Sequence, residues 1–412
     1  MILVNKRVNY LSIFAISYLL FTSPCVLGVT WISYNSNIIK ISNKTYYVIF
    51  AQFVILIFAL FIDKIKGKKI RQLYNNSEQI KKNDSSVIFL SQNNDSLFYF
   101  FAFISICFFV YELFFNIGLN EIAKGKNVYM QEASGLLNFS LYLAYSSFAY
   151  SLHMEKKWML ILSSSVILGF LFLGSRTYAT VAVVYFVVFF GSRIRKKITS
   201  NKKLLFGGAI GFYMMLLYKT IYTDVNTFRF DSVISKLSQS STYIEVFQFK
   251  DANTFMSLYD YIINSDFQLP FSDVIARILS VIPYANKIII TEYPLRLSDM
   301  FMNEWFRSTY GLGGTFFGET VTMFGILWGP IFSFAFILWL LNKLEDTPQK
   351  SLYSKCFSGI FASYTCFFIH RADWVQIVGA FKMVILIYLI TQTFNLMLYK
   401  RTIILKKKKI TL

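Results

Sequence analysis

The feature that most constrains the fold of this chain is a series of long apolar runs containing almost no charge. Of 412 residues, 55% are hydrophobic and 45 are phenylalanine. A helix of about 20 apolar residues crosses the roughly 30 Å hydrocarbon core of a bilayer. Composition and run length therefore predict an all-α polytopic membrane protein rather than a soluble domain. Ten spans are predicted, near residues 8–32, 45–63, 97–116, 134–154, 158–174, 178–192, 204–222, 315–342, 353–370 and 374–399.

The first run is too long for the apolar core of a signal peptide and is not followed by a convincing small-residue cleavage site. It is therefore interpreted as a retained first span. The four cysteines, Cys25, Cys107, Cys356 and Cys366, lie in or beside apolar runs without paired spacing or a histidine cluster. Neither a disulfide framework nor a metal site is indicated, and all four are expected to be small buried side chains.

The formal net charge of +19 is concentrated in the gaps between runs. With the N-terminus in the cytoplasm, the inner segments carry 26 Lys and Arg, including the tail 400–409. The short outer loops carry only Lys40, Lys44, Lys124, Lys126, Arg176 and Arg371. Because cytoplasmic loops are enriched in Lys and Arg, this orientation is predicted, with both termini cytoplasmic. Topology explains the charge, so no nucleic-acid partner is required.

Three regions follow from this topology. Residues 1–222 hold the first seven spans, residues 223–314 form one large extracytoplasmic loop, and residues 315–412 hold the last three spans and a basic tail. A loop of this length is expected to contain short helices. One is predicted over 274–282, capped by Ser272 or Asp273 and stopped by Pro283. A second stretch, 300–306, is expected to lie against the membrane surface.

Three arginines on the outer side are candidates for binding an anion. Arg176 follows Gly174 and Ser175 between two apolar runs, Arg277 is in the predicted loop helix, and Arg371 is in the last outer turn. A structural alternative exists for each: Arg176 as a lipid anchor, Arg277 in an exposed i,i+4 pair with Asp273, and Arg371 in an interfacial pair with Asp373. Lys382 is a further cation, about two turns into the last span, and must face protein or water.

Gly313 and Gly314 precede the eighth span, whose first turn carries Glu319. Unpaired N–H groups at a helix start attract anions, and glycine permits close approach of the backbone. A flexible hinge explains the glycines almost as well, and a carboxylate near a helix N-terminus can be purely structural. His370 is a candidate base, although most histidines at a helix end are simply solvated.

The candidates gain weight together, because all except Lys382 fall at one side of the membrane. Guanidinium groups bind diphosphate bidentately and stay charged at any relevant pH. A diphosphate leaving group needs such stabilisation as its bond to a sugar breaks. The sequence thus predicts that the outer loop caps an intramembrane cavity for a lipid-linked anionic substrate.

These features resemble the O-antigen polymerase family, the Wzy-type oligosaccharide repeat-unit polymerases. The resemblance rests on the Ser175–Thr177 turn, the outer loop with Arg277, the stretch 313–319 and the late Arg371, and covers about residues 160 to 380 plus the topology. It implies a fold similar to the helical, GT-C-like lipid-linked glycosyltransferases. It also implies transfer of a growing glycan from undecaprenyl diphosphate to the terminal sugar of another lipid-linked repeat unit, in synthesis of capsule or of lipopolysaccharide O-antigen.

The resemblance further implies roles for individual residues. Arg176, Arg277 and Arg371 would hold the diphosphate, while Glu319 or His370 would help deprotonate the acceptor hydroxyl. Gly313, Gly314 and Lys382 would contribute to substrate binding. No metal, cofactor or nucleotide sugar is expected. A bacterial inner-membrane location is implied, with a flippase and a chain-length regulator as partners in the same pathway.

Other functions remain open at this point. An O-antigen ligase uses the same donor and attaches glycan to a lipopolysaccharide core. A flippase for lipid-linked oligosaccharide would be a transporter, but transporters tend to carry internal repeats, and none is evident here. A structural membrane scaffold would tolerate loss of Arg176 and Arg371.

Overall fold

The computed structural model describes residues 9–27, 29–32, 37–78, 95–118, 121–122, 133–200, 229–245, 250–282, 315–345 and 351–410, with scattered positions between 213 and 227 and at 294 and 297. This part of the chain is helical apart from one short hairpin. Four of its helices are long and apolar enough to cross a membrane, as expected of a membrane protein: Asn43–Asp63, Asp95–Ile117, Phe316–Glu345 and Trp374–Met397.

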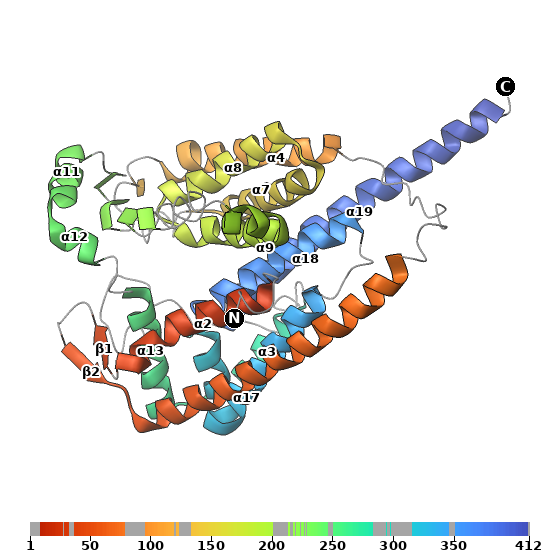
Figure 1. Ribbon diagram of the computed structural model, residues 1–412. Helices are drawn as coiled ribbons and strands as arrows, with labels where there is room; N and C mark the ends of the chain where they lie inside the picture. The colour runs from red at the N-terminus through yellow and green to blue at the C-terminus, as the bar shows by residue number, and fades with distance from the viewer. Residues whose placement is uncertain are drawn as a thin grey trace.

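The helices form two groups joined by a central pair (Figure 1). One group holds α4 (Asp95–Tyr111), α7 (Gly135–Met154), α8 (Lys157–Phe172) and α9 (Arg176–Ser200). The other holds α2 (Tyr10–Leu27), α3 (Asn43–Glu78), α13 (Lys250–Asn264) and α17 (Phe316–Glu345). Between them lie α18 (Leu352–Phe368) and α19 (Trp374–Ile410), and α18 contacts members of both groups.

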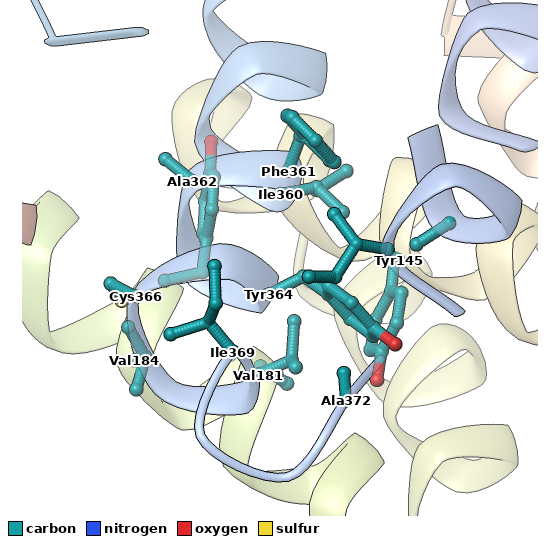
Figure 2. Close-up of a cluster of buried hydrophobic side chains, with 14 of the residues drawn as sticks. Tyr145, Val181, Val184, Ile360, Phe361, Ala362, Tyr364, Cys366, Ile369 and Ala372 are labelled. Carbon is teal, nitrogen blue, oxygen red and sulfur yellow. The ribbon is translucent and has the colours of Figure 1, made fainter. Parts of the chain in front are cut away.

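Apolar side chains hold the central pair to the first group. Figure 2 shows Tyr145 of α7, Val181 and Val184 of α9, and Ile360 and Tyr364 of α18 packed together. These side chains are buried, and the Tyr145 hydroxyl donates to the Tyr178 carbonyl at 2.6 Å, which also ties α7 to α9. Since lipid is as apolar as these residues, close packing and such hydrogen bonds hold membrane helices together.

The remaining elements lie at the ends of the bundle or beside it. Strands β1 (Val29–Ile32) and β2 (Asn37–Lys40) pair antiparallel, with Val29 opposite Lys40. A π-helical turn, η1 (Glu112–Ile117), continues α4. Among the described residues between α9 and α17, the short helices are α11 (Phe230–Ser238), α12 (Ser240–Glu245) and α14 (Phe271–Leu279). In α11, a hydrogen bond from Lys236, 2.5 Å from Asp224, lowers the pKa of that carboxyl.

Helix α17 is not one straight helix. Gly325 has a φ of 78°, a left-handed conformation that favours glycine, and the chain folds back there. Rings of the two arms meet in antiparallel order: Phe324 with Phe332, Phe317 with Phe334, and Phe316 with Phe336. A Cβ on Gly329 would collide with the Thr320 carbonyl oxygen, so this close crossing requires glycine.

The predicted span over 315–342 overlaps a candidate membrane span, but it is not one continuous helix. Residues 316–324 form a short arm that packs on a longer arm, residues 326–345, which is about 30 Å long at 1.5 Å per residue. The backbone N–H of Leu269 donates to the Thr322 carbonyl at 3.0 Å. That bond satisfies one of the acceptors that the end of the short arm leaves open.

Each of the other predicted spans overlaps a described helix, except 204–222, which lies mostly outside the described residues. The bounds differ: α3, α9 and α19 extend well past the predicted ends at 63, 192 and 399, and the first predicted span, 8–32, ends in strand β1. The cysteine prediction is confirmed for Cys25, Cys356 and Cys366, whereas Cys107 is exposed on α4. An exposed thiol on a lipid-facing helix is no anomaly, because lipid there replaces the protein interior.

Candidate functional site

A buried ion pair joins the loop region to α17. The Arg277 Nε donates to Glu319 Oε1 at 2.6 Å, and the two side chains are only 1% and 0% exposed. Arg277 is on α14 and Glu319 is in the first turn of α17. Removing two charges from solvent is costly, so such a pair persists only with close geometry and further hydrogen bonds.

Trp374, the first residue of α19, supplies those further bonds. Its backbone N–H donates to Glu319 Oε2, and its indole Nε1 donates to the Arg277 carbonyl at 2.6 Å. Its ring also stacks on Phe316, with centroids 5.8 Å apart. Glu319 therefore sits at the N-terminus of α19, where the helix dipole favours negative charge. Three elements far apart in sequence meet at one carboxylate.

Asp373 caps the same helix end. Its Oδ1 accepts from the Gln376 N–H at 3.0 Å, and its own N–H donates to Gln376 Oε1 at 3.3 Å. This is the reciprocal arrangement of a capping box. Asp373 is buried and close enough to Glu319 for the two carboxylates to repel. The ion pair with Arg277 acts against that repulsion.

His370 lies two residues after the end of α18, enclosed by aromatic rings. Its ring centroid is 5.0 Å from that of Phe21 and 5.5 Å from those of Phe14 and Phe317. Its Nε2 is 2.8 Å from Ser17 Oγ, and this hydroxyl donates to the Cys366 carbonyl. Because Ser17 has one proton to give, Nε2 is assigned as the donor and Nδ1 as an acceptor. Nδ1 is buried without a hydrogen-bond partner among the described residues.

The site lies well inside the bundle. Tyr18, whose ring contacts His370, donates to Gln52 Oε1 at 2.9 Å, and Gln52 Nε2 donates to the Tyr259 hydroxyl at 2.9 Å. Gln52 is nine residues along α3 from Asn43, or about 13 Å from that helix end. The loop helix α13, which carries Tyr259, thus reaches into the bundle rather than lying above it.

The other predicted cations lie on α9, in the turn before α19 and on α19 itself. Arg371 follows His370 in the turn before α19 and is half-buried. Arg176 starts α9 directly after the Gly174 turn, as the sequence predicts, and α9 packs on α18 and α8. Lys382 is half-buried in α19. Gly313 and Gly314 lie outside the described residues, so their predicted role stays a prediction.

Two sequence interpretations are corrected. Neither Ser272 nor Asp273 caps α14, because the helix runs from Phe271 to Leu279 rather than over 274–282, with Pro270 at the cap position and no side-chain cap. The alternative of an exposed Arg277–Asp273 pair is also wrong, because Arg277 is buried against Glu319. Pro283 itself lies outside the described residues.

Sequence reasoning missed Ser17, which contacts His370, and Gln52 and Tyr259, which are hydrogen-bonded beside it. Gln52 could have been found, since a glutamine in an apolar run needs a hydrogen-bond partner within the protein. No group of three or more His, Cys, Asp or Glu side chains that could hold a metal occurs in the part of the chain that the structure describes.

The chain was compared with protein-family models, curated proteins and solved structures, and nothing in these comparisons matches it.

Proposed function

We propose that this protein is a polymerase of lipid-linked oligosaccharide repeat units, with ten spans, both termini in the cytoplasm and the 223–314 loop outside. Contacts support this topology because they pair segments that the charge pattern assigns to the same side. Asn9 bonds Asp63 at 2.9 Å and Lys156 bonds Asp95 at 2.5 Å on the proposed inner side. The Ser42 N–H bonds Asp260 at 2.9 Å on the outer side.

The observation that carries the proposal is the convergence of Arg277, Glu319 and the start of α19 beside the turn with His370 and Arg371. Charged groups within membrane helices are costly and commonly mark a functional site. Arg371 in that turn and Arg176 at the start of α9 would stabilise the charge that develops on the departing diphosphate. The donor is undecaprenyl diphosphate carrying the growing glycan.

The contacts favour different roles for the two candidate proton acceptors. Both Glu319 oxygens are engaged, one by Arg277 and the other by the Trp374 N–H, so Glu319 serves as a positioning residue for Arg277. His370 Nδ1 has a lone pair that no described group uses, and it is therefore the proposed base for the acceptor hydroxyl. Substrate binding must part the surrounding rings to reach it.

The test is complementation of a deletion strain, with the surface glycan resolved as a ladder on a gel. Arg176→Ala and Arg371→Ala are expected to abolish long chains while the protein still inserts normally. Arg→Lys at either position should restore them poorly, because a point charge does not replace a bidentate fork. Arg229→Ala, an exposed arginine at the start of α11, is the matched control and should leave the ladder unchanged.

Normal ladders from both alanine variants would remove the case for diphosphate binding. The deletion strain itself separates the related enzymes. Single repeat units on the surface polysaccharide support a polymerase, whereas finished polymer left on the carrier lipid identifies a ligase instead.

A further inference from the structure

Helix α14 has two faces of opposite character. One face buries Val274 and Arg277 against the rest of the protein. The other presents a stripe of large apolar side chains, Phe271, Ile275 and Ile278, which are 79%, 40% and 48% exposed. Their spacing of four and three residues places them on one side of the helix, and Ile282, which is 51% exposed, follows the helix end. A soluble loop would not leave such a stripe in water.

The contacts of α14 fix its depth relative to the membrane helices. Two residues before α14, the Leu269 N–H donates to the Thr322 carbonyl, and Arg277 near the end of α14 bonds Glu319. Thr322 and Glu319 both belong to the short arm of α17, which packs along the longer arm. The helix therefore lies alongside an apolar hairpin and at the start of α19, not above the bundle.

The surface beside α14 is also apolar. Trp374 bonds the Arg277 carbonyl, and its ring is 6.3 Å from that of Phe336 on the longer arm of α17. Phe336 packs in turn against Trp339, which is 56% exposed. The stripe on α14 thus continues into the outward-facing surface of a candidate membrane span.

From this we infer that α14 is a re-entrant helix whose stripe contacts the acyl chains of the bilayer half nearest the β1–β2 hairpin. Acyl chains then contact one face of α14, while the ion pair with Glu319 fixes the opposite face to α17. The bilayer and the ion pair together keep the helix in place. The inference depends on the membrane spans and not on the proposed enzymatic activity.

The test uses the full chain in lipid nanodiscs with an environment-sensitive dye on single cysteines. The background is Cys107→Ser, since the other three cysteines are buried. Dye is placed at Phe271→Cys, Ile275→Cys or Ile278→Cys, and, as a control, at Ser235→Cys, an exposed position on α11. Because Phe271 is 79% exposed, labelling there does not disturb packing.

The expected result is a several-fold increase in emission at the three α14 positions relative to position 235. Spin-labelled acyl chains should quench the α14 dyes strongly, and aqueous iodide should quench only the control. Two results would overturn the inference. Iodide quenching at α14 equal to that of the control means that water covers the stripe. High emission that neither quencher reduces means that protein covers it.

Discussion

At the residue scale, the most informative contact is the Arg277–Glu319 pair, because substituting one partner and substituting both have different expected effects on stability. Truncating one partner of a buried pair leaves the other charge without compensation in a desolvated site. Replacing both by apolar residues of similar size removes the charges together. The two experiments separate the contribution of the pair to folding from its contribution to activity.

Glu319→Gln is expected to destabilise the purified protein by about 3–5 kcal/mol, because it leaves the Arg277 guanidinium buried opposite a neutral amide. Thermal unfolding in detergent, followed by intrinsic fluorescence, measures this. The double variant Arg277→Met/Glu319→Leu should recover most of that stability and still make no long chains. A double variant with a normal ladder would show that the pair is structural only.

At the element scale, α17 shows what the sequence does and does not encode locally. The apolar composition of 316–345 predicts a helix long and apolar enough to cross a membrane, and the structure is helical over this range apart from Gly325. Gly325 and Gly329 also occur in that run, but glycine alone does not specify whether a membrane helix bends. The fold-back depends on the Thr320 backbone reaching Gly329 and on pairs such as Phe317–Phe334, which only the folded chain brings together.

Gly329→Ala tests the hairpin. The added Cβ would meet the Thr320 carbonyl oxygen and carbon, which cannot move aside as a side chain can. Overpacking of this kind costs about 1–3 kcal/mol, so a lower unfolding temperature is expected. Gly379→Ala in α19 is the control, since a Cβ added there would meet no described atom within 4 Å. Equal stability of the two variants would contradict the close crossing of the arms.

The same limit applies to the candidate site. The sequence singles out Arg277 and Glu319 separately, because an arginine in a loop helix and a carboxylate in an apolar run are both unusual. It cannot pair them, since the 223–314 loop offers seven Lys and Arg as possible partners for one carboxylate. Likewise His370 is visible in the sequence, whereas its contact with Ser17 spans 353 residues.

At the scale of the whole molecule, α3 and α19 both extend toward the same end, and the β1–β2 hairpin lies at the other (Figure 1). The basic C-terminal parts of both helices are predicted to be cytoplasmic. Lys156 and Asp95 fall at that same end, where their hydrogen bond raises the pKa of the lysine. Charge pattern and contacts thus agree on which ends of the helices belong together.

The proposed topology predicts opposite labelling of two exposed positions in spheroplasts, which have lost the outer envelope but keep an intact inner membrane. In the Cys107→Ser background, Asn264→Cys at the end of α13 should react with a membrane-impermeant maleimide from outside. Lys157→Cys at the start of α8 should react only after permeabilisation. Labelling of position 157 in intact spheroplasts, with protection of position 264, would show that the orientation is the opposite one. The proposed site would then face the cytoplasm, where the extracytoplasmic substrate does not reach it.

The ion pair between the loop and the hairpin has a consequence for biosynthesis. Ribosomes make α14 before α17, so in the proposed topology Arg277 is translocated before the segment carrying Glu319 leaves the insertion channel. Releasing a charged carboxylate into lipid without a counter-ion costs free energy. Here Arg277 is already on the extracytoplasmic side and can pair with Glu319 as it is released. Folding of the loop and lateral release of the eighth apolar run are therefore expected to be one coupled event.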